Sequence, residues 1–264
     1  MTIGRAENSK AHAPKWNLVW QDEFDYKLEN LDNNWNFETG YGSNGWGNNE
    51  WQEYTKENVE IIDGILIITA RSSKNPTKRD GSITSARLNT LNKFEFRPGV
   101  RIVSRIKLPW GQGIWPAFWA LGTNYPSVGW PTCGEIDILE MIGGNPVSNP
   151  SNYTVHSTVH WNDNNNRKNY QHAMYGKHKK IEEPLSDDYH IFELIYSNNY
   201  LETKIDGNPI FKVDTKTGQV AKPFNNNFFF ILNVAVGGNW PGDPSPDTVF
   251  PQRMYIDYIR VYEQ

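Results

Sequence analysis

Hydrophobic and polar residues alternate along most of this chain with a period of two, the pattern of strands that bury one face. Turn residues interrupt the pattern at intervals of roughly ten residues. The hairpin signal is clearest at Asp63-Gly64 and Asp206-Gly207, where β-branched runs flank an Asp-Gly pair. Helical periodicity is scarce, and only residues 176–188 favour a short helical turn. The pattern therefore predicts an all-β protein.

The expected strands follow one another without a break in composition. Residues 1–14 are polar, lack the apolar core of a signal peptide and are expected to form a disordered leader. Residues 15–264 are expected to form one domain, because all-β sandwiches often reach ~200–250 residues. So many short strands favour a sandwich of two sheets. Besides the hairpins at 59–70 and 201–213, strands are expected at 99–107, 114–121, 135–141, 154–161, 190–196, 228–236 and 253–262.

The composition excludes several classes of protein. The 264 residues include 11 Trp, 13 Tyr and 12 Phe, and the formal net charge is −4. No apolar run approaches the ~20 residues of a membrane helix, and an acidic chain lacks the basic surface that nucleic acid requires. Cys133 is the only cysteine, so it is expected to be a small buried hydrophobe and not half of an internal disulfide. The excess of Trp suggests flat apolar surfaces on which a ligand stacks, while Trp16, Trp20 and Trp35 are expected to pack the sandwich.

Three acidic residues crowd the expected strand at residues 135–140. On a regular strand Glu135 and Asp137 share a face, whereas Glu140 would point into the core. Burying an unpaired carboxylate is costly. A β-bulge at 138–139 would add one residue and return Glu140 to the acidic face. We therefore expect a bulged strand with three carboxyls on one face.

This arrangement suits acid–base chemistry on sugars. Neighbouring carboxyls repel one another, which raises the pKa of at least one of them. Retaining glycoside hydrolysis needs an ionised nucleophile and a protonated acid ~5–5.5 Å apart, and strand residues i and i+2 lie about 6.5–7 Å apart. A solvated acidic strand is the alternative. The enzymatic reading is favoured because Trp115 and Trp119 share a strand face nearby, where their indoles can stack on sugar rings.

The segment Trp-Pro-Thr-Cys-Gly-Glu-Ile-Asp-Ile-Leu-Glu at 130–140 resembles the active-site strand of family 16 glycoside hydrolases. Its bulged spacing is similar to that of the laminarinases, which are endo-β-1,3-glucanases. Mixed-linkage lichenases and xyloglucan-modifying enzymes tend to have a shorter E-x-D-x-E. The resemblance covers residues 16–262, and its landmarks are specific in their order: 19–25, 51–55, 84–88, 111–122, 130–140, 228–238 and 255–262.

The resemblance implies a β-jelly-roll sandwich of two curved antiparallel sheets, with an open substrate cleft across the concave sheet. Matched by position, Glu135 is the expected nucleophile, Asp137 the assisting acid and Glu140 the general acid/base. The segment does not depart from the active pattern. No cofactor is expected for catalysis.

Further residues are expected to bind the substrate beside Trp115 and Trp119. Arg87 resembles the family arginine that contacts sugar in the non-reducing half of the cleft, with a surface salt bridge as the alternative, and Trp240 resembles a stacking residue at the rim. His160 is expected to hydrogen-bond the acid/base or a sugar hydroxyl, with a satisfied histidine of the cleft wall as the alternative. A zinc site of His156, His160 and Glu135 is disfavoured, since no tetrahedral ligand set is evident. Trp110 is either an additional stacking ring or a loop anchor.

Two surface features complete the expected site. The Gly- and Asn-rich loop at 40–50 is expected to line the cleft with amide groups, because it carries no phosphate-binding motif. On the convex side the resemblance implies a structural Ca²⁺, whose matching positions are Glu23, Gly64 and Asp257, with a simple strand-end carboxylate as the alternative for Asp257. Mixed backbone and carboxylate oxygens suit that ion.

The sequence therefore predicts a retaining endo-β-1,3-glucanase that hydrolyses laminarin-like polymers, with mixed-linkage β-1,3-1,4-glucan as a further candidate substrate. A transglycosylase on β-glucans and a non-catalytic glucan-binding jelly roll are the alternatives. Linkage preference stays open, because agarases and carrageenases share the bulged strand. We expect an extracellular monomer whose partner is a β-glucan polysaccharide, with no nucleic acid and no membrane.

Overall fold

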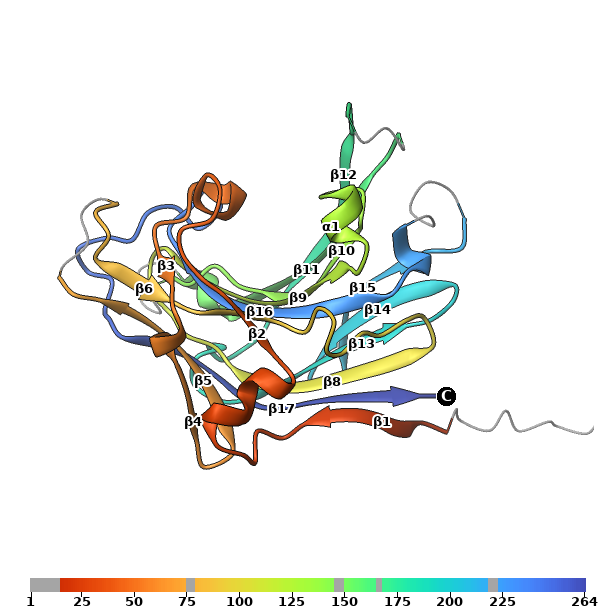
Figure 1. Cartoon of the computed structure of the whole chain (residues 1–264), viewed down its shortest axis with the longest axis horizontal. Coiled ribbons are helices and arrows are strands. Elements are labelled where there is room, and N and C mark those ends of the chain that lie inside the picture. Colours follow the sequence, from red (N-terminus) through yellow and green to blue (C-terminus); the bar gives the residue numbers. More distant parts are fainter. Residues whose placement is uncertain (1–14, 75–78, 145–149, 165–167, 218–222) are drawn as a thin grey trace, which may run out of the picture.

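The computed structural model describes residues 15–74, 79–144, 150–164, 168–217 and 223–264 (Figure 1). In these ranges strands pair into one sheet of ten strands and one of seven. The predicted all-β sandwich of two sheets is therefore confirmed. The expected leader at 1–14 lies outside the described residues.

The ten-stranded sheet forms the convex layer of the sandwich. Its pairs are antiparallel except for β3 and β6, which run parallel. Two strands lie off the main path: β1 (Asn17–Asp22) pairs with β17, and β4 (Val59–Ile62) pairs with β5. Along the main path the order is β15 (Asn208–Asp214), β14 (Tyr200–Ile205), β13 (His190–Tyr196), β8 (Val100–Lys107), β17 (Gln252–Glu263), β5 (Ile65–Ser72), β6 (Ile83–Ser85) and β3 (Glu53–Tyr54).

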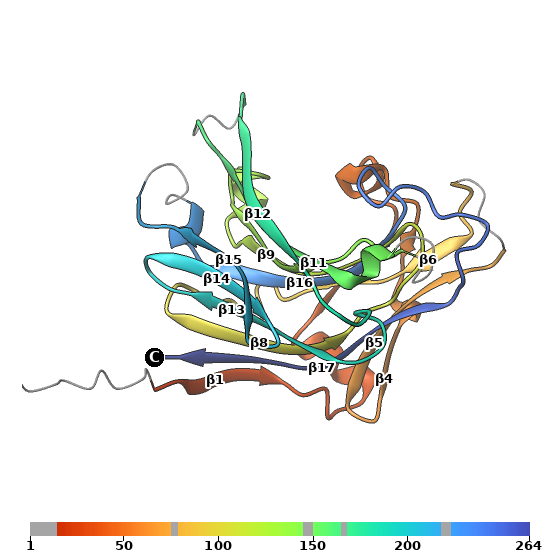
Figure 2. The same ribbon diagram turned by 180° about the vertical axis from the view of Figure 1, so that it is seen from behind.

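The seven-stranded sheet carries the acidic strand. Its order is β12 (His172–Lys180), β11 (Thr154–Asn162), β10 (Glu135–Glu140), β9 (Ile114–Gly122), β16 (Phe228–Val236), β7 (Arg87–Asn89) and β2 (Asn36–Glu38). Figure 1 shows β12 rising steeply at one end and the loop after β2 rising at the other, and Figure 2 shows the same curvature from behind. The outer face of this sheet is therefore concave, with β10 next to its central strand β9.

Helices are short in the described chain. The α-helix α1 spans Tyr125–Val128, and a turn with left-handed residues, η2, spans Gly45–Asn49. The 3-10 helices are η1 (Leu28–Asn33), η3 (Lys56–Asn58), η4 (Pro150–Tyr153) and η6 (Pro223–Asn225). None of the helices in the described ranges has the length and apolar character to cross a membrane.

The short turn expected at 176–188 is present only in the second half of that range. Residues 176–180 belong to the edge strand β12, which pairs with β11 along its whole length. The remainder contains a turn in which the Asp187 N–H donates to the Pro184 carbonyl at 3.0 Å. Most of β12 is exposed on an edge, so its polar side chains do not alternate with apolar ones and the period of two is lost.

Both predicted Asp-Gly hairpins are confirmed. Asp63 and Gly64 have φ of 51° and 74°, and Asp206 and Gly207 have φ of 48° and 74°. Two successive residues with positive φ form the type I′ turn, whose twist matches that of the flanking strands. The register of β4 and β5 accordingly pairs Ile62 with Ile65 across the turn.

The main hydrophobic core lies between the sheets, and β16 shows how the sequence builds it. All nine residues of β16 are buried. Phe228, Phe230 and Leu232 belong to the main core, whereas Phe229 and Ile231 join a smaller cluster with Cys133. Apart from Asn233, this strand is hydrophobic because both of its faces are covered. The burial expected for Cys133 is confirmed.

The Trp residues assigned to the sandwich are placed as expected in two of three cases. Trp35 is fully buried in the core. Trp20 packs against the core and stacks on Phe94, with ring centroids 4.2 Å apart. Trp16 is half-buried and belongs to neither core cluster, so the expectation fails there.

Candidate active site

The strand β10 contains the predicted bulge. On one side Asp137 pairs with Thr158 and Glu140 with His156, so three steps along β10 match two along β11. On the other side the register shifts between Asp137 and Leu139. Ile138 and Leu139 are both fully buried in the main core. The extra residue thus lets two consecutive apolar side chains stay in the core while Glu140 returns to the face of Glu135 and Asp137.

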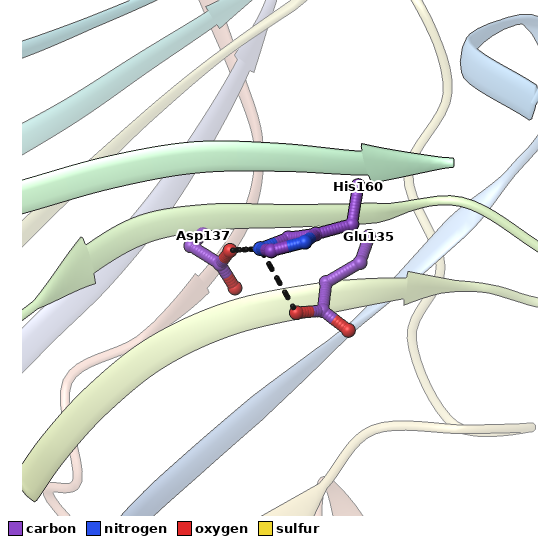
Figure 3. A group of neighbouring side chains, drawn as sticks. All are labelled: Glu135, Asp137 and His160. Atoms are coloured by element: carbon purple, nitrogen blue, oxygen red, sulfur yellow. Dashed lines mark ion pairs between the residues drawn. The ribbon is translucent and has the colours of Figure 1, made fainter. Parts of the chain in front are cut away.

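His160 faces two of these carboxyls from β11, directly across the ladder from Glu135. Its Nε2 lies 3.1 Å from Asp137 Oδ2 and 3.8 Å from Glu135 Oε1 (Figure 3). Asp137 is nearly inaccessible to solvent, whereas Glu135 and Glu140 are half-buried. The outer two carboxyls can therefore meet a ligand, and the central one is enclosed.

Two indoles hold the outer carboxyls. The Trp130 N–H donates to Glu135 Oε2 at 2.8 Å, and the Trp115 N–H donates to Glu140 Oε1 at 3.1 Å. An indole has one donor and no acceptor, so each bond favours the ionised form of its carboxyl. Because the two rings also offer apolar faces, each is placed to touch a sugar and to orient an acid.

The electrostatics of β10 favour protonation. Burial raises the pKa of Glu135 to about 8, and the charge of Asp137 adds to the rise. Burial likewise raises the pKa of Asp137 to about 8. Glu140 has a pKa well above its ordinary value, first because of burial and then because of the charges of Asp137 and Glu135. Carboxyls on this strand therefore keep protons near neutral pH, which supplies the site with a proton donor.

Glu135, Asp137 and His160 also form a group whose possible metal-ligand atoms lie within 4.8 Å of one another. The strand register accounts for this closeness, because Glu135 and Asp137 share a face of β10 and His160 pairs with Glu135 across the ladder. Three ligands from two strands do not define the tetrahedral set that zinc prefers. We therefore interpret the group as a proton-sharing cluster.

A second cluster lies on the outer face beyond β16. Arg87, on β7, forms an ion pair with Glu38 at 2.6 Å. Its guanidinium lies 4.6 Å from the ring of Trp46 and 4.9 Å from the ring of Trp119. The salt bridge considered for Arg87 is present, and the side chain is only 11% exposed. Arg87 is thus built into an aromatic cluster next to the acidic strand, and its contact with sugar stays a prediction.

Trp240 lies near the other side of the acids. Its ring meets that of Trp115 edge-on at 5.5 Å and that of His156 at 4.9 Å. It is 40% exposed. The structure therefore brings the predicted rim residue Trp240 next to Trp115, which contacts Glu140.

Trp110 is half-buried, and its backbone N–H donates to the Gln252 side chain. This bond tests neither of the two roles considered for the Trp110 ring.

The loop at 40–50 meets the loop of Trp240. Asn49 donates to the Asn239 side chain at 2.9 Å, and the Asn239 N–H donates to the Asn48 carbonyl at 2.9 Å. The Asn48 amide donates to Glu50. The amides of Asn48, Asn49 and Asn239 therefore hold the two loops together. The Asn48 and Asn49 side-chain donors, which were expected to line the cleft, are used within the protein.

Two residues at the site had no role assigned from the sequence. Trp130 was part of a landmark, but only the structure shows its bond to Glu135. His172 stacks on His160 with ring centroids 5.1 Å apart, and the facing ring nitrogens lie 2.9 Å apart. Because β12 was not among the expected strands, its histidine could not be placed beside β11.

The positions matched to calcium lie in the convex layer. A Cβ added to Gly64 would lie 2.8 Å from Asp25 Oδ1 and 3.8 Å from the Glu23 carbonyl oxygen. Asp257 follows Ile256, which pairs with Leu66. The Asp257 carboxylate contacts Arg105 at 2.6 Å. Oxygen atoms therefore gather at Gly64, which fits a calcium site in chemistry, while the Asp257 carboxylate has a cationic partner.

Comparison with known families identifies the class of protein. The model of glycosyl hydrolases family 16 matches residues 46–260. The match covers most of the chain, which therefore belongs to this family, and the resemblance found in the sequence is confirmed.

Individual relatives refine this result. The β-glucanase of Rhodothermus marinus is 36% identical over 95% of this chain and 86% of its own length. The clotting factor G α subunit of Tachypleus tridentatus is 38% identical over 99% of this chain, which spans only 36% of that subunit. Among solved structures, the laminarinase catalytic domain from Thermotoga maritima is 42% identical with a TM-score of 0.82, covering 95% of this chain and 99% of that one. The chain is thus similar to laminarinases in sequence and in fold.

Proposed function

We propose that this protein is a retaining endo-β-1,3-glucanase that hydrolyses laminarin-like β-1,3-glucans. The observation that carries the proposal is the bulged strand β10, which presents Glu135, Asp137 and Glu140 on one face between Trp130 and Trp115. Similarity to the Thermotoga maritima laminarinase supports the choice of substrate. Mixed-linkage β-1,3-1,4-glucan is a further candidate substrate, supported by 26% identity to an endo-1,3-1,4-β-glycanase of Rhizobium meliloti.

In the first step Glu135 attacks the anomeric carbon of the sugar and forms a covalent glycosyl ester. Glu140 gives its proton to the glycosidic oxygen, so the leaving chain departs as a neutral alcohol. The raised pKa of Glu140 supports this role, because the acid must be protonated before bond cleavage. Trp130 supports the role of Glu135, because its N–H stabilises the carboxylate that attacks.

In the second step water replaces the leaving chain. Glu140, now a carboxylate, takes a proton from this water. The water oxygen attacks the anomeric carbon at the same time, and Glu135 is released as a carboxylate. Two inversions at one carbon give overall retention. The proton that Glu140 lost in the first step is thereby restored.

Asp137 and His160 act on Glu135 in this scheme. Asp137 shares a hydrogen bond with Glu135, so a proton held between them can move to Asp137 when Glu135 becomes the nucleophile. His160 Nε2 stands beside both groups and can stabilise the remaining charge. Asp137 is almost fully buried, which supports an assisting role in place of direct attack.

The indoles of Trp115, Trp119 and Trp240 supply apolar faces for sugar rings in this proposal, and Arg87 supplies hydrogen-bond donors. Trp115 and Trp240 stand near Glu140, whereas Trp119 and Arg87 stand together beyond Asp137. This distribution supports glucosyl binding on both sides of the bond to be cleaved.

Product analysis tests the proposal. Purified protein is incubated separately with laminarin, lichenan, agarose and xyloglucan, and products are separated by size. We expect early release of mixed oligosaccharides from laminarin. Exchange of chain lengths without net shortening would indicate the transglycosylase, and binding without any change would indicate the glucan-binding jelly roll. Cleavage of agarose alone would overturn the substrate while leaving the chemistry.

We also propose that the carbonyl oxygens of Glu23 and Gly64 and the Asp257 carboxylate hold a structural Ca²⁺. The oxygen atoms that surround Gly64 support this site, and the ion would brace β1, the first hairpin and β17. A chelator should lower the melting temperature, and added Ca²⁺ should restore it. An Asp257→Asn variant that responds to the chelator as the parent does would overturn the site.

Because a glucan polymer does not cross membranes, the proposed activity also implies an extracellular protein.

A further inference from the structure

A buried acid that the proposed mechanism does not use lies at the end of the loop 40–50. Glu50 is 4% exposed. Its carboxylate accepts hydrogen bonds from Asn48 at 3.1 Å, from Gln52 at 2.7 Å and from Tyr54 at 3.3 Å. The two amide nitrogens can only donate, so the oxygens that they contact must accept. Burial raises the pKa of Glu50, while these bonds and the charge of Arg87 oppose the rise.

The bonds continue from Glu50 to the aromatic cluster on the concave face. Asn233 Nδ2 donates to the Tyr54 hydroxyl at 3.1 Å, and Trp119 Nε1 donates to Asn233 Oδ1 at 2.7 Å. An indole N–H can only donate, so the Asn233 oxygen must face Trp119 and the Asn233 nitrogen must face Tyr54. The Tyr54 oxygen therefore accepts from Asn233, and its own proton is free to be donated to Glu50. Every bond therefore runs in one direction, from Trp119 through Asn233 and Tyr54 to Glu50.

The interior of this chain of bonds is shielded from water. Tyr54 is fully buried and Asn233 is 6% exposed. A polar group in such a place is costly unless it is paired, so each member depends on the next. Trp119, at the outer end, is half-buried and lies opposite Asp137 in the β9–β10 ladder. The far end of the network thus reaches a ring beside the proposed catalytic acids.

We propose that Glu50 and Tyr54 are positioning residues that, through Asn233, fix the orientation of the Trp119 indole for the sugar bound next to Asp137. The inference rests on the proposed function, in which a glucan occupies this face. A ring already held in its binding orientation loses less conformational freedom when the sugar binds. The network therefore acts on substrate affinity more than on bond cleavage.

The structure offers a matched control network. Asp22, on β1, accepts hydrogen bonds from the Tyr26 hydroxyl at 2.8 Å and from the Trp35 indole at 2.9 Å. It is also a buried carboxylate, but it belongs to the convex sheet. Tyr54→Phe and Tyr26→Phe thus each remove one hydroxyl from a carboxylate network that contains an indole. Only the first network reaches the concave face.

The first measurement needs no substrate. Indole ¹H–¹⁵N signals are recorded by NMR, and those of Trp119 and Trp35 are assigned with Trp119→Phe and Trp35→Phe. We expect Tyr54→Phe to shift the Trp119 signal and speed exchange of its N–H, while the Trp35 signal stays in place. Tyr26→Phe should move the Trp35 signal and leave that of Trp119. An unchanged Trp119 signal in Tyr54→Phe would overturn the inference.

The second measurement separates positioning from a merely structural role. With laminari-oligosaccharides, Tyr54→Phe should raise KM about two- to tenfold, the effect of one lost hydrogen bond, with kcat unchanged within experimental error. Tyr26→Phe should leave both constants unchanged. In Glu50→Gln the new amide oxygen can still accept the Tyr54 hydroxyl, but the new amide nitrogen faces a donor of a neighbouring amide. We therefore expect a smaller rise in KM than in Tyr54→Phe.

A fall in kcat at constant KM in Tyr54→Phe, or equal effects in both Tyr variants, would overturn the positioning role. If the parent protein does not hydrolyse β-glucan, the proposed function fails. The NMR comparison would still decide whether Tyr54 controls Trp119.

Discussion

His160 Nε2 lies 3.1 Å from Asp137 Oδ2, and the same nitrogen lies 3.8 Å from Glu135 Oε1. One imidazole thus faces the central and the first carboxyl of β10 at once. Glu140, beyond the bulge, has the Trp115 indole as its donor instead. The three carboxyls share one strand face but have different partners, and this difference allows them to have different roles.

The indole donors of the two outer carboxyls should each affect a different limb of the pH–activity profile. Trp130→Phe removes the donor to Glu135, which raises the pKa of the nucleophile and should move the acidic limb upward by about one pH unit. Trp115→Phe removes the donor to Glu140, which raises the pKa of the acid and should move the basic limb upward by a similar amount. The measurement is kcat/KM against pH for each variant. Both variants shifting the same limb would contradict the separate roles.

The two outer acids should also differ in chemical rescue. With an aryl β-glucoside substrate, whose leaving group needs no acid, Glu140→Ala still forms the ester at Glu135, and azide then displaces Glu135 to give a β-glucosyl azide. Glu135→Ala leaves space for azide to attack directly, which gives an α-glucosyl azide. NMR of the products identifies each anomer. Exchanged anomers would reverse the assignment, and the same anomer from both variants would refute it.

Activity on laminarin should fall in both of these variants. Loss of the proposed acid/base at Glu140 is expected to cost on the order of 10²–10⁴-fold in kcat. Loss of the proposed nucleophile at Glu135 is expected to cost about 10⁴-fold or more, since the covalent route disappears. Reducing-sugar release measures both effects. A Glu135→Ala variant that keeps more than a tenth of the parent activity would be incompatible with the mechanism.

Stability should fall as the pH rises toward 8. The pKa of Asp137 is about 8 in the folded protein and 3.8 in its ordinary state, so the folded protein holds a proton that the unfolded chain releases. This stabilisation is complete below the ordinary pKa and is lost as the pH rises through the folded value. His156, whose pKa burial lowers to about 4, acts in the opposite direction below 6.5. Between pH 6.5 and about 8 the opposing effect of His156 is absent, so this range is used for the test.

Melting temperature measured across that window tests this prediction. The parent should lose stability steadily, and Asp137→Asn should flatten the slope because it removes one of the titrating groups. Asp188→Asn, at an exposed carboxyl, serves as the control and should keep the parent slope. A melting temperature that does not fall over this range would contradict the raised pKa of Asp137.

The bulge itself can be tested with two deletions of the same residue type. Deleting Ile138 removes the extra residue, and regular alternation then keeps all three acids on one face. Deleting Ile136 places Glu135 and Asp137 on opposite faces. Activity on laminarin, with circular dichroism to confirm folding, should survive in part only in the first variant. Equal activity in both would show that the shared face is unnecessary.

The acidic strand could be predicted from sequence because its pattern conflicts with simple alternation. A carboxylate at Glu140 and an apolar side chain at Leu139 are each on the wrong face unless a residue is inserted, and burial energies decide in favour of the bulge. The Asp-Gly hairpins were similarly predictable, since few residue pairs accept two positive φ values.

Other parts of the site depend on contacts between segments distant in sequence. Tyr54 and Asn233 are 179 positions apart, and their hydrogen bond follows only from the packing of both sheets. The edge strand β12 has too little buried surface to show a period of two, so His172 could not be placed next to His160. Arg87 likewise showed no sign of its position between Trp46 and Trp119, because local patterns do not encode ring contacts across strands.

The configuration of the first product tests the central claim most directly. Laminarin is hydrolysed by the parent protein in an NMR tube, and the anomeric protons of the new reducing ends are followed before mutarotation is complete. Retention through a Glu135 ester predicts that the β-anomer appears first and then relaxes toward the equilibrium mixture. Initial appearance of the α-anomer would contradict the account, because it would mean that water attacks the glucan directly and that Glu135 is not the nucleophile.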